Sequence, residues 1–80
     1  MTKDDIMEEV TGIFKETFRD ENIVLSDNMT ADDVDNWDSL THTIMIANIE
    51  EHFSIKFKIR EVMKLKNVGI LINTIENKLN

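Results

Sequence analysis

Apolar residues recur at three- and four-residue intervals in three separate stretches of this 80-residue chain, and this spacing limits it to a helical fold. The first stretch predicts an amphipathic helix over residues 3–19, with an apolar face formed by Ile6, Met7, Val10, Ile13, Phe14 and Phe18. Thr2 and Asp5 have the spacing of a capping box at its start. Gly12 lies inside this helix at a cost of about 1 kcal/mol relative to Ala, and it would permit a close helix contact.

The other two stretches predict a second long helix from about residue 38 to residue 53 and a last helix that begins after Asn67, a favourable N-cap residue. The apolar face of the last helix consists of Val68, Leu71, Ile72, Ile75 and Leu79. A short helical turn is expected near residues 59–63. Residues 54–58 alternate like a strand but have no partner strand, so we expect an extended loop with Ile55 and Phe57 turned inward.

Residues 20–37 have no long helical period, and a connection of this length in a small domain is often functional. Thr30 to Val34 predict a single capped turn within it, and Met29, Val34 and Trp37 are its expected anchors to the core. The predicted fold class is therefore all-α: residues 1–80 form one domain, a small four-helix bundle of three long helices and one short helix. A long loop separates helices one and two.

The charges of the chain are concentrated in this loop. The segment from Asp20 to Asp38 contains seven acidic residues and no basic one, whereas the rest of the chain contains nine of each, so the net charge of −7 belongs to this segment. Such a balance argues against a nucleic-acid partner, which requires a basic face. The acidic run is either a solvated loop or a docking surface for basic partners.

The composition of the chain excludes several kinds of site and indicates where the protein is located. The absence of cysteine excludes a disulfide scaffold, a thiolate metal site and a cysteine nucleophile. The N-terminal residues lack the apolar core of a signal peptide, and the longest apolar run, from Ile44 to Ala47, is far shorter than the roughly 18 residues of a membrane span. We therefore expect a cytoplasmic monomer without a membrane span.

The second long helix has two apolar faces. At about 100° per residue, Met45, Ile46, Ile49 and Phe53 share one side, which we expect to face the core. Leu40, Ile44 and Ala47 form a second stripe on the opposite side. A surface helix needs only one apolar face. The second stripe is therefore either covered by a loop or a docking patch for other proteins.

The start of this helix is the sequence Asp38-Ser39-Leu40, directly after the acidic loop. A lone serine at a helix start is usually a capping or first-turn residue. Here it lies near mid-chain in a small helical protein, in a helix that ends in Ile49-Glu50-Glu51-His52-Phe53. Over nearly the whole chain, this combination resembles the acyl carrier protein family of phosphopantetheine-binding carriers, and in particular a specialised free-standing carrier of bacterial type.

The resemblance implies that Ser39 is esterified with 4′-phosphopantetheine, the covalent cofactor, by a phosphopantetheinyl transferase (a holo-carrier synthase). The thiol of that arm would hold an acyl group as a thioester and present it to partner enzymes, including an acyl-loading ligase or acyltransferase. Asp38 and Leu40 complete the attachment motif. The partner-docking residues implied are Asp35, Leu40, Ile44, Ala47, Glu50 and Glu51.

The chain departs from the better-known fatty-acid carriers at Thr41 and Ile44, where many members have acidic residues. This difference favours a specialised carrier with its own loading partner. Two alternatives stay open at the level of the sequence. One is an aminoacyl or peptidyl carrier, and the other is an unmodified helical interaction module in which Ser39 only caps the helix.

An enzyme and a metal site are the remaining alternatives. Asp38, Ser39 and His42 are close on the helix, but a hydrolase also needs an oxyanion hole and a pocket, so we expect no catalytic residue. His42 is expected to be a surface or half-buried residue near the arm. His42 and His52 lie on different faces of the helix, and the acidic loop lacks the glycine and ligand order of an EF-hand, so we expect no metal site.

Overall fold

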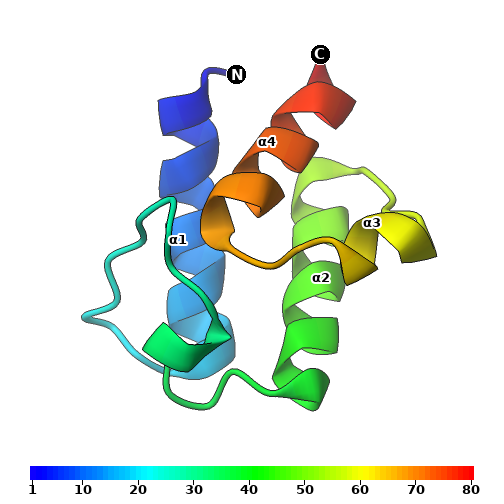
Figure 1. Ribbon diagram of the computed structural model, residues 1–80. Helices are drawn as coiled ribbons and strands as arrows, with labels where there is room; N and C mark the ends of the chain where they lie inside the picture. The colour runs from blue at the N-terminus through cyan, green and yellow to red at the C-terminus, as the bar shows by residue number, and fades with distance from the viewer.

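The computed structural model describes residues 1–80 and is built from helices alone. Its elements are α1 (Lys3–Phe18), the 3-10 helix η1 (Ala31–Asp33), α2 (Ser39–Phe53), α3 (Ile59–Met63) and α4 (Val68–Leu79), shown in Figure 1. This confirms the predicted all-α bundle of three long helices and one short helix. The single turn at residues 31–33 and the extended segment after α2 are also where the sequence predicts them.

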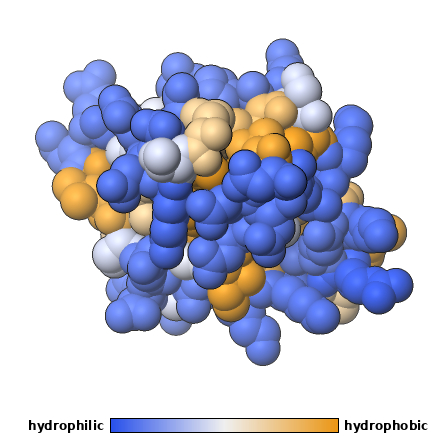
Figure 2. Space-filling view, turned by 90° about the horizontal axis from the view of Figure 1, so that it is seen from above, coloured by the Kyte–Doolittle hydropathy of each residue, from blue (hydrophilic) through white to orange (hydrophobic).

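The core lies where α1 packs against α2 and α4. The apolar faces predicted for the three long helices all contribute to one hydrophobic cluster, in which Met7 and Leu79 are partly buried. Of the two faces of α2, the one that carries Met45, Ile46, Ile49 and Phe53 is buried, as expected. Both termini lie at the same end of the bundle (Figure 1), and the surface there is mainly hydrophilic with several small apolar patches (Figure 2).

Local signals set the ends of the helices. The Thr2 hydroxyl accepts a hydrogen bond from the Asp5 N–H, and the Asp5 carboxylate accepts one from the Thr2 N–H, so the predicted capping box is present. At Gly12 the structure corrects the expectation of a close helix contact. No atom lies within 4 Å of the position that a Cβ would occupy, and the residue is exposed to solvent. Gly12 therefore weakens α1 without serving a packing role.

The long loop between α1 and α2 is attached to the start of α4, and Figure 1 shows it rising beside α1 to reach that point. The backbone N–H groups of Val68 and Gly69 donate to the carbonyls of Met29 and Asp27, each at 2.9 Å. The first N–H groups of a helix have no partner within it, so the loop satisfies them. A Cβ at Gly69 would lie 3.0 Å from the Asp27 carbonyl oxygen, so glycine fits this close approach and any larger residue would require the loop to shift.

Side chains of the loop also reach the core. Met29, Val34 and Trp37 are buried or partly buried against it, which confirms all three predicted anchors. Ile23 is a further buried anchor, and Leu25 packs partly buried against the core, whereas Val24 between them is exposed. The helical pattern did not reveal these anchors, because the short run Ile23-Val24-Leu25 has no helical spacing around it. The loop therefore follows a defined path, and that path ends at the first residue of α2.

The short helix α3 is tied to α4 by a side chain near the C-terminus. Lys78 forms an ion pair with Glu61 at 2.8 Å, and its ammonium lies 5.7 Å from the centre of the Phe57 ring. The outer face of α3 leaves Ile59 and Met63 exposed to solvent. None of the helices has the length and apolar character needed to cross a membrane.

Candidate functional site

The start of α2 is capped by Asp38. Its carboxylate accepts a hydrogen bond from the Thr41 N–H at 2.9 Å, and its own N–H donates to the Thr41 hydroxyl oxygen at 2.8 Å. The hydrogen bond from the Thr41 N–H lowers the pKa of Asp38 below its ordinary value, so this side chain is an anion at neutral pH. Ser39 is therefore the first residue of the helix and not its cap.

Thr41 has a second role, which the sequence analysis missed. Its hydroxyl donates a hydrogen bond to the Asn36 carbonyl oxygen at 2.6 Å. Asn36 has a left-handed backbone with a φ of 71°, a conformation that asparagine tolerates better than most residues. Thr41 thus ties the turn at residues 36–38 to the helix. The spacing of Asp38 and Thr41, an N-cap and a hydroxyl at N3, was the available sequence signal.

The hydroxyl of Ser39 is free. Ser39 is exposed, and the hydrogen bonds at this helix start use Asp38, Thr41, Thr43 and the Ser39 carbonyl but not its hydroxyl. A serine at a helix start commonly serves as a cap, which is the structural role that would occupy its oxygen. Because Asp38 has taken that role, the Ser39 oxygen is available for chemistry with an external group.

A shallow, open hollow of about 430 Å³ lies beside Ser39 and is lined by Ala31, Trp37, Asp38, Ser39 and His42. The Trp37 indole forms one wall, packed edge-on against Phe14 and tilted against Phe18. Its Nε1–H donates a hydrogen bond to His42 Nδ1 at 3.0 Å, and the two rings are nearly parallel, with centres 6.0 Å apart. Trp37 is thus an anchor of the core that also faces the exposed serine.

The hydrogen bond from Trp37 determines the protonation of His42. An indole N–H can only donate, so Nδ1 of His42 is the acceptor and the imidazole proton resides on Nε2. Burial lowers the pKa of His42 below its ordinary value, which favours the same neutral form. The lone pair of His42 is therefore directed at Trp37. In this arrangement His42 is therefore not placed to act as a base toward Ser39.

The residues that the sequence predicts for partner docking lie in three places: on one side of α2, in the loop before it, and at Glu50. Leu40, Ile44, Ala47 and Glu51 fall on one side of α2 at about 100° per residue, and all four are exposed. We call these four residues the α2 stripe. Leu40 is 70% and Ile44 44% exposed, so no loop covers the stripe. Asp35 is exposed in the loop that leads to α2.

Glu50 lies apart from the α2 stripe. Its carboxylate accepts a hydrogen bond from the Phe57 N–H at 2.8 Å, and the side chain is partly buried. This contact ties the end of α2 to the loop that precedes α3. The structure thus brings Asp38, Ser39 and Leu40 together at one end of α2, continues the exposed stripe to Glu51, and turns Glu50 toward the interior.

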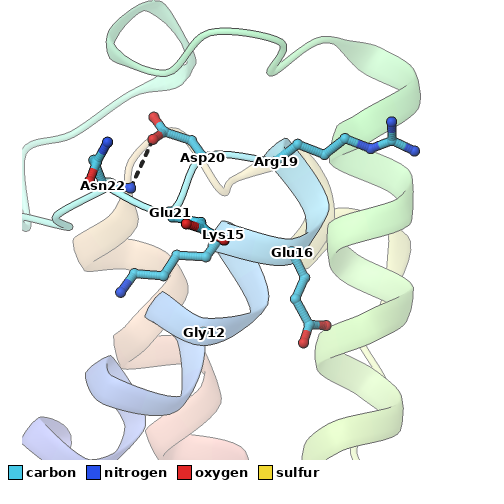
Figure 3. Close-up of a pocket in the computed structure, with 7 residues that line it drawn as sticks. All are labelled: Gly12, Lys15, Glu16, Arg19, Asp20, Glu21 and Asn22. Carbon is cyan, nitrogen blue, oxygen red and sulfur yellow. Dashed lines mark hydrogen bonds between the residues drawn. The ribbon is translucent and has the colours of Figure 1, made fainter.

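Two other hollows have no feature of a site. The larger is an open depression of about 850 Å³ at the end of α1, where Gly12, Lys15, Glu16, Arg19, Asp20, Glu21 and Asn22 form a lining without hydrophobic residues (Figure 3). Figure 3 marks one hydrogen bond between their side chains and backbone, a local one from the Asn22 N–H to the Asp20 carboxylate. The other hollow is small and includes Glu51 and His52. No group of three or more His, Cys, Asp or Glu side chains could hold a metal ion.

Comparison with known proteins places this helical bundle among the carrier proteins. An acyl carrier protein of Petrotoga mobilis is 35% identical over 81 residues, which cover 100% of this chain and 94% of that protein. The solution structure of a holo acyl carrier protein from Geobacter metallireducens superposes with a TM-score of 0.87 at 44% identity, covering 91% of this chain and 84% of the other. No protein-family model matches the chain.

The chain therefore belongs to the acyl carrier protein family. The resemblance inferred from Asp38-Ser39-Leu40 and the helix pattern is confirmed, and the function of the protein is that of an acyl carrier.

Proposed function

We propose that Ser39 is the attachment residue for a 4′-phosphopantetheine arm. The observation that carries the proposal is the free, exposed hydroxyl of Ser39 at the first residue of α2. The surroundings fit such a group, because the oxygen opens onto solvent and onto the hollow beside Trp37. The similar protein from Geobacter metallireducens is described as a holo acyl carrier protein. When bound, the arm supplies the thiol that this cysteine-free chain lacks.

Attachment requires a transferase and coenzyme A. The Ser39 oxygen forms a bond to the phosphorus that bears the pantetheine, the pyrophosphate bond of coenzyme A breaks, and adenosine 3′,5′-bisphosphate leaves. The hydroxyl proton must go to a base. His42 directs its lone pair at Trp37, and Asp38 is a weak base with a lowered pKa. The proton acceptor therefore comes from the phosphopantetheinyl transferase, and the carrier itself contributes no catalytic residue.

The α2 stripe and the acidic loop are proposed as the surface on which partners dock. The stripe begins next to Ser39, so an enzyme that acts on the arm contacts it first, and Asp35 adds a negative charge at the same end. The seven acidic residues from Asp20 to Asp38 favour partners with a basic surface. Ile44 is an apolar contact in the middle of this surface. It supports a loading ligase or acyltransferase adapted to this carrier.

We also propose that the chain acts as one domain, and a cytoplasmic location stays a prediction.

Glu50 is a weaker docking candidate than Glu51, because its carboxylate already binds the Phe57 N–H. Asp38 and Leu40 are proposed as the residues that the transferase recognises on either side of Ser39. They are exposed, and the cap formed by Asp38 presents Ser39 in a fixed backbone conformation.

Intact-mass measurement after incubation with coenzyme A and a phosphopantetheinyl transferase tests the proposal. The native chain should gain the mass of one phosphopantetheine group, and Ser39→Ala should gain none. Ser26→Ala is the matched control, because Ser26 is another exposed serine, and it should be labelled like the native chain. Labelling of Ser39→Ala, or a native chain that stays unmodified, would overturn the assignment. The second result would favour an unmodified interaction module.

A further inference from the structure

The hollow beside Ser39 has a composition that suits part of a flexible arm. Ser39 is itself one of its five lining residues, so a group joined to the Ser39 oxygen starts at the edge of the hollow. Trp37 and His42, whose rings are nearly parallel, form another part of the wall. Trp37 is held in place by Phe14 and Phe18, which makes the wall rigid before anything binds.

The hydrogen bond between Trp37 and His42 determines which donors of the wall are left for a ligand. The Trp37 N–H is already used by His42 Nδ1, so the indole offers only an apolar surface. His42 keeps its second N–H, on Nε2, free to donate. The residues that line the hollow therefore include two rings and one unused hydrogen-bond donor.

Charge selects which part of the arm can enter. Asp38 is one of the lining residues, and its ionised carboxylate repels a phosphate group. The next portion of the arm, the pantoyl unit, is uncharged. It carries two methyl groups on one carbon, followed by a hydroxyl and an amide. The methyl groups match the ring surfaces, and either oxygen can accept from the His42 Nε2–H.

We propose that the Trp37–His42 pair forms a cradle for the pantoyl segment of the arm, which would hold the start of the arm against the α1–α2 loop while its thiol end remains mobile. This inference rests on the proposed attachment at Ser39. It assigns to Trp37 and His42 a ligand contact in addition to their packing role. His42 is a positioning residue here, since it contacts the arm and takes no part in bond formation.

The single tryptophan of the chain, which also lacks tyrosine, provides a direct probe of this cradle. Apo and holo forms are prepared with coenzyme A and transferase, and intact mass establishes the modification. In the holo form we expect reduced acrylamide quenching of Trp37 emission and a shifted Trp37 Nε1–H resonance. We also expect nuclear Overhauser contacts between the indole ring and the two pantoyl methyl groups. Ser39→Ala in the same mixture controls for free coenzyme A and should show none of these changes.

His42→Ala gives the second arm of the test. With this variant converted to the holo form and checked by mass, the contacts to the pantoyl methyl groups and the protection from acrylamide should be lost. A native holo protein of the correct mass, with unchanged Trp37 quenching, an unchanged Nε1–H resonance and no methyl contacts, would refute the cradle but leave Ser39 as the attachment residue. Absence of the mass increase itself would refute both.

Discussion

Asp38 and Thr41 exchange two hydrogen bonds at the start of α2: the Asp38 N–H donates to the Thr41 hydroxyl at 2.8 Å, and the Thr41 N–H donates to the Asp38 carboxylate at 2.9 Å. The same hydroxyl holds the Asn36 carbonyl. Thr41 thus links the turn before Ser39 to the first turn of α2 after it, and the link depends on the Thr41 hydroxyl.

Replacement of Thr41 by valine should therefore destabilise the protein, while Thr41→Ser should be nearly neutral. Valine has the same shape but loses the contacts of the hydroxyl to Asp38 and Asn36, at a cost of about 1 kcal/mol for a surface cap. Serine keeps the hydroxyl. Urea denaturation of the three proteins measures the difference. Equal midpoints for the valine and serine variants would show that the hydroxyl does not hold this turn.

Glu50 and Glu51 are adjacent acids with different expected roles. Glu50→Ala removes the hydrogen bond to the Phe57 N–H and should lower the free energy of unfolding by roughly 1–2 kcal/mol. Glu51→Ala removes an exposed side chain and should change it by less than about 0.5 kcal/mol. Glu51→Ala should instead slow modification by the transferase, because Glu51 belongs to the α2 stripe. Thermal melts and labelling rates on both variants separate the two roles, and a reversed pattern would contradict them.

Ile44→Glu places a charge in the middle of the α2 stripe. Ile44 is 44% exposed, so the stability should change by no more than about 0.5 kcal/mol. Loading by the native ligase or acyltransferase should weaken, because the partner would have to bury a charge in an apolar contact. Asn73→Glu, an equal charge at an exposed position of α4, is the control and should load normally. Identical loading of the two variants would remove Ile44 from the docking surface.

His42 should make the stability of the protein depend on pH. Burial lowers its pKa in the folded state below the ordinary value of 6.5. Between these two pKa values the unfolded chain binds more protons than the folded chain, so the free energy of unfolding rises with pH. The stabilisation that neutral His42 contributes is fully present above pH 6.5 and is lost as the pH falls through the folded-state pKa. Protonation also ends the ability of Nδ1 to accept from Trp37.

The measurement compares unfolding midpoints of the native chain and His42→Gln as the pH is lowered below 6.5. Glutamine does not titrate and still offers an acceptor, and His52 is present in both proteins, so the difference reports His42. The native chain should lose stability more steeply as the pH falls. A parallel course of the two curves would show that His42 has the same pKa in both states.

The two glycines should respond to alanine in opposite ways. Gly12→Ala should stabilise the protein by up to about 1 kcal/mol, because the helix gains a better helix former and the added methyl group meets no atom within 4 Å. Gly69→Ala should destabilise it, because the added Cβ would lie 3.0 Å from the Asp27 carbonyl oxygen. Thermal melts provide the comparison. A destabilised Gly12→Ala variant would show that α1 needs glycine for a reason other than space.

The helices and their limits could be predicted from the sequence, since they depend on contacts within a few residues. The spacing of the apolar residues predicts the buried face of each long helix, and Thr2, Thr30 and Asn67 mark three starts with side chains that bind N–H groups two or three residues ahead. Asp38-Ser39-Leu40 identified the candidate attachment site, because its residues are consecutive.

The contacts between residues distant in the chain could not be predicted in this way, because they depend on how the helices pack. The Asp27 and Met29 carbonyls bind the first N–H groups of α4, about forty residues later in the sequence, because both segments are brought to the same point by packing against α1. The packing of α2 in the bundle left the side with Leu40 and Ile44 exposed. It also placed Glu50, and not Glu51, within hydrogen-bond distance of the Phe57 N–H. The pairing of Trp37 with His42 arose in the same way, because the loop must first bury the indole against Phe14 before its N–H can reach the imidazole.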